Sequence, residues 1–107
     1  MKRYGMVIQV KPEHEEAYRI AHAAVPPDVL RMIRECNIRN YSIYLRNSVL
    51  YSYFEYTGSD FSADMAKMAA DPATQLWWSR VAPMQEPLPD RAPDEWWANM
   101  EEVFHLD

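Results

Sequence analysis

The feature that most constrains the fold is a pair of strand-like segments in the middle of the chain, residues 39–46 and 49–56. Both segments are rich in β-branched, apolar and aromatic residues, and only Asn47-Ser48 separates them. A two-residue connection of this kind predicts a β-hairpin with a tight turn. The hairpin in turn predicts an antiparallel sheet, because strands joined by so short a loop run in opposite directions.

The alternation of side chains predicts that large residues occupy both faces of this hairpin. One face carries Tyr41, Ile43 and Leu45 with Leu50, Ser52 and Phe54, and the other carries Ser42, Tyr44 and Arg46 with Val49, Tyr51 and Tyr53. A sheet covered on one side only should have polar residues on its far side. We therefore expect helices over the first face and a second copy of the chain over the second, which makes a homodimer.

Periodicity, prolines and helix-start signals predict the remaining elements. We expect a strand at 3–10, helical segments at 13–22, 28–36, 61–70 and from 72 to before Pro83, an extended loop at 83–93 and a last short strand at 101–106. Treating each interrupted helix as one unit, the order is strand, helix, strand, strand, helix, strand. This order is the split βαβ, ferredoxin-like arrangement (βαββαβ), an α+β fold with an antiparallel sheet and helices on one face.

Composition limits what such a domain can do. With 107 residues the chain forms one domain, 1–107, because two smaller pieces could not bury useful cores. The net charge of −5 argues against a nucleic-acid partner, and no apolar run is long enough to cross a membrane. The first residues lack the apolar stretch of a signal peptide, so we expect a cytoplasmic location. The dispersed histidines and the two glycines form neither a metal motif nor a phosphate-binding loop, so we expect no metal and no cofactor.

The residues that could perform chemistry converge if the predicted fold is correct. Tyr18 and His22 are four apart and share one face of the first helix. Tyr41 lies on the central hairpin and Trp77-Trp78 on the second helix, and both helices should cover the same sheet face. Imidazole can give or take a proton near neutral pH, while phenols and indoles supply hydrogen bonds and apolar surface. On the residues alone, His22 could equally be an ordinary helix histidine.

All four tryptophans occur in two adjacent pairs, Trp77-Trp78 and Trp96-Trp97. Neighbouring helix positions point about 100° apart, so one ring of the first pair can enter the core while the other turns to a rim or pocket. The second pair lies between the proline-containing loop and the end of the chain. We expect it to pack the C-terminal segment.

Four segments together resemble the L-rhamnose mutarotase family over nearly the whole chain: Tyr18-Arg19-Ile20-Ala21-His22, Asn40-Tyr41-Ser42-Ile43-Tyr44-Leu45, Trp77-Trp78 and Glu102-Val103-Phe104-His105-Leu106. The resemblance implies a dimeric ferredoxin-like protein that interconverts the α and β anomers of L-rhamnose without a cofactor. By position, His22 matches the family's proton donor. Tyr18, Tyr41, Trp77 and Trp78 match its sugar-contacting residues.

One departure from the family concerns Pro26, which stands where relatives commonly have a tryptophan before the next proline. The resemblance then implies a reshaped sugar site and leaves the preferred sugar open. Two other functions remain open on the same scaffold. One is a cofactor-independent monooxygenase or lactone isomerase that acts on aromatic substrates, and the other is a non-catalytic sugar-binding dimer.

Overall fold

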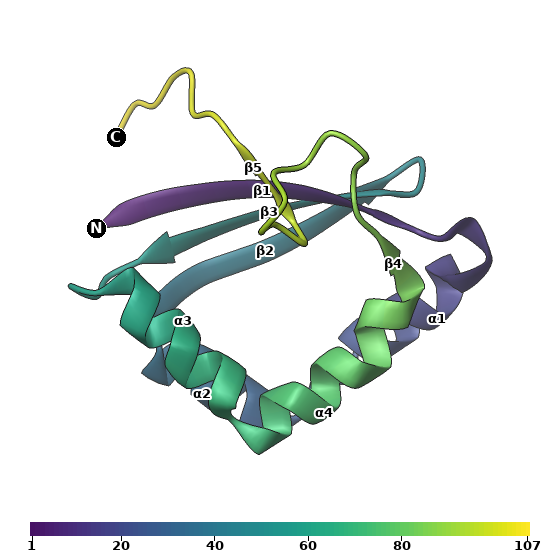
Figure 1. Ribbon diagram of the computed structural model, residues 1–107, viewed down its shortest axis with the longest axis horizontal. Coiled ribbons are helices and arrows are strands. Elements are labelled where there is room, and N and C mark those ends of the chain that lie inside the picture. Colours follow the sequence, from purple (N-terminus) through teal and green to yellow (C-terminus); the bar gives the residue numbers. More distant parts are fainter.

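An antiparallel sheet lies on one side of a layer of four helices in the computed structural model, which describes residues 1–107 (Figure 1). The strands are β1 (Lys2–Val10), β2 (Ile38–Arg46), β3 (Val49–Tyr56), β4 (Gln85–Glu86) and β5 (Ala98–Met100). The helices are α1 (Glu15–His22), α2 (Pro27–Glu35), α3 (Phe61–Ala70) and α4 (Pro72–Val81), with short 3₁₀ turns at Pro12–His14 and Ala82–Met84. The strand order is β2-β3-β1-β4, with β5 also pairing with β1, which confirms the predicted ferredoxin-like α+β fold.

The central hairpin forms as predicted. Asn47 and Ser48 both have positive φ angles, 51° and 60°, which is the backbone of the tight turn whose twist suits two antiparallel strands. Arg46 pairs with Val49 and Leu45 with Leu50. A bulge between Arg39 and Ser42 shifts the register further along β2. The bulge was not predicted, and it sets the position of Tyr41.

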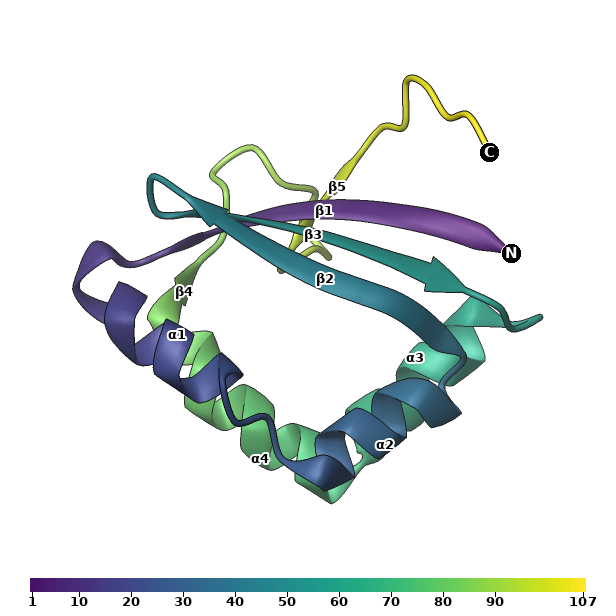
Figure 2. The ribbon, with the colours of Figure 1, turned by 180° about the vertical axis from the view of Figure 1, so that it is seen from behind.

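Prolines and aspartates divide the helical layer as expected. Pro27 begins α2 and Pro72 begins α4, since the missing N–H of proline costs nothing in the first turn of a helix. Asp71 caps α4 by accepting a hydrogen bond from the backbone N–H of Thr74. Seen from either side, all four helices lie against the same face of the sheet (Figures 1 and 2).

Two groups of buried side chains fill the space between sheet and helices. The first contains Ile8, Val10, Tyr18, Ala21, Val29, Leu50, Trp77 and Val81. The second contains Cys36, Ile38, Phe54 and Met68, which confirms that Cys36 is a small buried residue. The first group matters for function because it contains Tyr18 and Trp77.

The prediction for the end of the chain was wrong. The strand is at Ala98–Met100, where Gly5 pairs with Met100, and residues 101–107 follow without regular structure. Val103, Phe104 and Leu106 are exposed, so the apolar side chains of this segment have no layer to pack on within one chain. This segment runs away from the sheet on the side opposite the helices (Figures 1 and 2). The predicted extended loop at 83–93 begins within the 3₁₀ turn Ala82–Met84 and contains the strand β4, which pairs with Gln9 and Val10.

Candidate active site

Helix α1 holds Tyr18 and His22 one turn apart, as their spacing predicted. The two rings stack with centroids 4.1 Å apart. The Nδ1 atom of His22 lies 2.9 Å from the backbone carbonyl oxygen of Tyr18. Because a carbonyl can only accept, Nδ1 carries the proton in this contact. In the neutral ring, Nε2 is therefore the nitrogen with a free lone pair.

Helix α4 brings Trp77 to the same place. Its ring meets that of His22 edge to face, with centroids 5.1 Å apart. Trp77 is 9% exposed and Trp78 is 42% exposed, so the pair divides between core and surface as the helix geometry predicted. Trp78 makes no ring contact with Tyr18 or His22.

Tyr41 approaches from the bulged part of β2. Its ring lies edge to face with Phe54, with centroids 5.6 Å apart, and about half of the residue stays exposed. Burial around its hydroxyl, with a smaller contribution from the nearby Tyr18, raises the pKa of Tyr41 to about 12. Tyr41 is thus a neutral hydrogen-bonding group at physiological pH.

A small pocket of about 130 Å³ opens between α1 and the central hairpin. It is lined by Tyr18, Arg19, His22, Ile43, Leu45 and Leu50. Tyr18 and His22 supply polar groups at this pocket, and the hairpin supplies an apolar wall. Of the five predicted site residues, Tyr18 and His22 line the pocket and Trp77 contacts the His22 ring from outside the lining. Tyr41 and Trp78 also lie outside the lining of the pocket.

Electrostatics keep His22 neutral at rest. Burial lowers the pKa of His22 below its usual value, the positive charge of Arg80 lowers it further, and the bond to the Tyr18 carbonyl opposes both. Burial raises the pKa of Tyr18, and its hydrogen bond from Gln85 partly offsets this. The site therefore holds a neutral imidazole beside a protonated phenol.

Sequence reasoning missed Gln85 and Arg80 near the site, and it assigned Trp96 to packing of the C-terminal segment. The side-chain amide of Gln85 donates to the Tyr18 hydroxyl over 3.1 Å, and the Trp96 indole donates to Gln85 over 2.7 Å. The guanidinium of Arg80 lies 5.7 Å from the Trp77 ring centroid. Gln85 and Arg80 belong to no motif or periodic pattern, and only the fold of the segment after α4 brings Gln85 and Trp96 to Tyr18. Trp97 packs against the first core group, which confirms a packing role for that ring.

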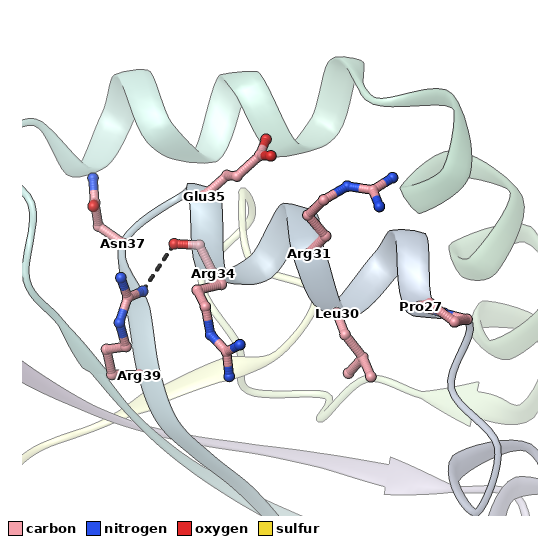
Figure 3. A pocket seen from close by; sticks show the side chains of 7 residues that line it. All are labelled: Pro27, Leu30, Arg31, Arg34, Glu35, Asn37 and Arg39. Atoms are coloured by element: carbon pink, nitrogen blue, oxygen red, sulfur yellow. Dashed lines mark hydrogen bonds between the residues drawn. The ribbon is translucent and has the colours of Figure 1, made fainter.

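A larger hollow, of about 570 Å³, lies elsewhere, along α2 and the start of β2 (Figure 3). It is lined by Pro27, Leu30, Arg31, Arg34, Glu35, Asn37 and Arg39. The Arg39 guanidinium is held by the carbonyl oxygens of Arg34 and Ile38, and Arg31 is paired with Asp28. We place the candidate site at the smaller pocket, because only that one combines a titratable imidazole with an apolar wall.

Pro26 is the N-cap of α2, and its carbonyl accepts hydrogen bonds from the N–H groups of Val29 and Leu30. It is not among the lining residues of the pocket. No group of three or more His, Cys, Asp or Glu side chains is arranged to hold a metal ion. No helix is long and apolar enough to cross a membrane.

Comparison with solved structures finds other proteins with the same fold. The structure superimposes on an L-rhamnose mutarotase from Formosa agariphila with a TM-score of 0.78 at 19% sequence identity, covering 100% of both chains. It superimposes on the tetracenomycin F2 cyclase of Streptomyces glaucescens, a type-II polyketide cyclase, with a TM-score of 0.71 at 16% identity and the same coverage. At these identities the likeness concerns the fold alone.

Sequence comparison identifies the family. The chain is 32% identical over 110 residues to an L-rhamnose mutarotase from Ligilactobacillus salivarius, covering 98% of this chain and 97% of that protein. It is 33% identical over 109 residues to an L-rhamnose mutarotase from Phocaeicola vulgatus, covering 100% of both. The family model described as L-rhamnose mutarotase matches residues 3–106. The chain therefore belongs to the L-rhamnose mutarotase family.

Proposed function

We propose that this protein is an isomerase that interconverts the α and β anomers of L-rhamnose, or of a closely related aldose, by cofactor-free acid–base catalysis. The observation that carries the proposal is the His22 ring, stacked on the Tyr18 ring and held through Nδ1 by the Tyr18 carbonyl, at an apolar pocket. Membership of the family favours this function over a monooxygenase, a lactone isomerase or a non-catalytic sugar-binding dimer.

Anomer exchange requires the bond between C1 and the ring oxygen to break. Nε2 of neutral His22 takes the proton of the anomeric hydroxyl, the ring oxygen takes a proton from a donor on its own side, and a free aldehyde forms. After rotation about the bond to C1, the ring closes and His22 returns its proton, which is how a neutral resting histidine also serves as proton donor. Positioned acid–base groups typically contribute about 10²–10⁴-fold.

The other predicted site residues surround this chemistry in the proposal. The hydroxyls of Tyr18 and Tyr41 orient the sugar through hydrogen bonds, and Trp77 offers an apolar surface beside His22. Trp78, on the exposed side of α4, is assigned to the outer rim of the sugar site. A 6-deoxy sugar has a methyl group that suits such apolar surfaces.

The test is His22→Ala, followed by anomer exchange of L-rhamnose measured by saturation-transfer NMR. We expect the catalysed rate to fall by about 10²–10⁴-fold, to near the spontaneous rate, in a variant that keeps its circular dichroism spectrum. Running L-fucose, D-ribose and D-galactose in parallel reports the preferred sugar. Undiminished exchange in the folded variant would exclude His22 from the mechanism.

The homodimer is part of the same proposal. On the sheet face opposite the helices, Tyr44 is 66% exposed and Tyr51 is also exposed. Val103, Phe104 and Leu106 in the last segment add apolar surface on that side of the sheet. Exposed apolar surface of this kind is costly in water, and a second copy of the chain would bury it. A cytoplasmic location also belongs to the proposal, since the one cysteine is free.

Sedimentation equilibrium checks the homodimer. We expect a dimer at micromolar concentration for the native chain and a monomer for the double substitution Tyr44→Lys, Tyr51→Lys, because like charges would face one another across the interface. The paired control Leu76→Lys, on an exposed position of α4, should stay dimeric. A monomeric native chain would remove this part of the proposal.

A further inference from the structure

Gln85 is a buried polar residue that joins two regions separated in the sequence. It is 6% exposed, and its side-chain amide is the only protein group bonded to the Tyr18 hydroxyl. The amide oxygen accepts from Nε1 of Trp96 at 2.7 Å, and the amide nitrogen donates to the Tyr18 hydroxyl oxygen at 3.1 Å. Trp96, Gln85 and Tyr18 therefore form one hydrogen-bonded chain, and its last member, Tyr18, is among the residues that line the pocket.

The direction of this chain is fixed by the chemistry of its first member. An indole N–H can only donate, so the oxygen of the Gln85 amide must face Trp96 and the NH₂ group must face Tyr18. The Tyr18 hydroxyl then acts as acceptor toward Gln85. Its own proton has no acceptor within the protein, and it lies in a residue that lines the pocket.

We infer that Gln85 and Trp96 are positioning residues that fix Tyr18 as a hydrogen-bond donor to the bound sugar. The inference rests on the proposed function and deepens it. Among the oxygens of a cyclic sugar, the ring oxygen carries no hydrogen and can only accept. A hydroxyl locked as donor is therefore matched to the ring oxygen, the atom on which charge develops as the ring opens. The free Nε2 of His22, in the ring stacked on Tyr18, is matched to the anomeric hydroxyl.

The experiment uses Gln85→Glu, which has nearly the same shape and the opposite polarity. A carboxylate can only accept, so it would accept a hydrogen bond from the Tyr18 hydroxyl. The hydroxyl proton would then point toward residue 85 and away from the sugar. We expect the catalysed exchange of L-rhamnose at pH 8 to fall by about 10²-fold, with kcat affected more than KM. Once protonated, the introduced carboxyl group can donate to Tyr18 again, so the ratio of variant to native rate should rise as the pH falls.

The pH dependence of that ratio separates positioning from simple structural support. Dividing by the native rate removes the part of the His22 titration that both proteins share. The new carboxylate would raise the pKa of His22, which by itself would lower the ratio at acidic pH, so a rise of the ratio reports on position 85. Gln85→Leu should lose activity equally at every pH, because leucine can neither donate nor accept. A ratio for Gln85→Glu that does not change with pH, in a folded variant, would overturn the inference.

Trp96 offers a second test with a matched control. Trp96→Phe removes the donor that orients the amide, and we expect a severalfold loss in kcat with a smaller change in KM. Trp97→Phe alters the neighbouring ring, which packs on the core and does not bond to Gln85, and should leave kcat nearly unchanged in folded protein. Equal effects of the two substitutions on kcat would argue against the inference. If the native protein itself does not accelerate exchange, the proposed function fails instead.

Discussion

Two buried tyrosines, Tyr18 and Tyr56, are each 4% exposed and yet use their hydroxyls in opposite ways. The Tyr56 hydroxyl donates to the Asp64 carboxylate at 2.5 Å and accepts from the backbone N–H of Asp60 at 3.1 Å. Asn37 completes that group by donating to the same carboxylate oxygen. Tyr18 accepts from Gln85 and keeps its own proton uncommitted.

The difference teaches how a functional hydroxyl can be recognised. Burial is equal at the two positions and raises both pKa values, that of Tyr56 to about 12, so neither burial nor pKa distinguishes them. What distinguishes them is whether the proton is already used within the fold. Tyr56 joins β3 to α3 and is structural, whereas Tyr18 has a donor left for a ligand at a pocket.

The largest expected effect comes from removing each hydroxyl in turn. Tyr18→Phe should lower the catalysed exchange by about 10²-fold, because it removes the donor to the sugar, and should also lower the Tm, because the buried Gln85 amide loses its acceptor. Tyr56→Phe should leave the rate per folded molecule unchanged and lower the Tm by roughly 4–8 °C, since Asp64 and the Asp60 N–H lose a partner. Saturation-transfer NMR and thermal melts of both variants check this. If both variants lose only stability, Tyr18 has no role in catalysis.

The region around Tyr18 and the region around Tyr56 should respond to pH in different pH ranges. Burial depresses the pKa of His22, so catalysed exchange should stay level at neutral pH and decline only below about 6.5, as Nε2 becomes protonated. Hydrogen bonds from Tyr56 and Asn37 depress the pKa of Asp64. Both depressed values mean that the unfolded chain binds protons more readily, so each group loses stabilising effect as the pH falls.

Denaturant melts across pH resolve the two contributions. The loss linked to His22 begins near pH 6.5, and that linked to Asp64 begins near pH 3.9, from the usual values of the two groups. His22→Ala should remove the upper loss only, and Asp64→Asn the lower one only. If both variants lose stability over the same pH range, neither assignment holds.

The smallest expected effect concerns neighbouring charges. Arg80 lowers the pKa of His22, so Arg80→Gln should move the acid limb of the activity profile to higher pH. Lys67 lowers the pKa of Asp64, so Lys67→Gln should raise that carboxyl pKa and leave the activity profile in place. Screening by salt should weaken both effects, because both cations are exposed. If Lys67→Gln shifts the pH profile of activity, the two regions are not independent.

Local patterns were enough to predict most of the fold. Asn47-Ser48 predicted the hairpin, Pro72 after Asp71 predicted a new helix, and the spacing of Tyr18 and His22 placed both on one face of α1. Each of these rests on interactions within a few residues. The prediction of the last strand failed because a segment forms a strand only where a partner edge is present, and within one chain residues 101–107 have none.

The sequence by itself determined the order of elements, the family and the Tyr18–His22 pair, because these depend on spacing and composition. Only the tertiary structure decided that Trp77 reaches His22 while Trp78 stays exposed, and that a bulge sets the place of Tyr41. It also decided that Gln85 meets Tyr18 across 67 positions of chain. Such contacts are set by how the segment after α4 returns to pair with β1, and no local periodicity encodes where that return places a side chain.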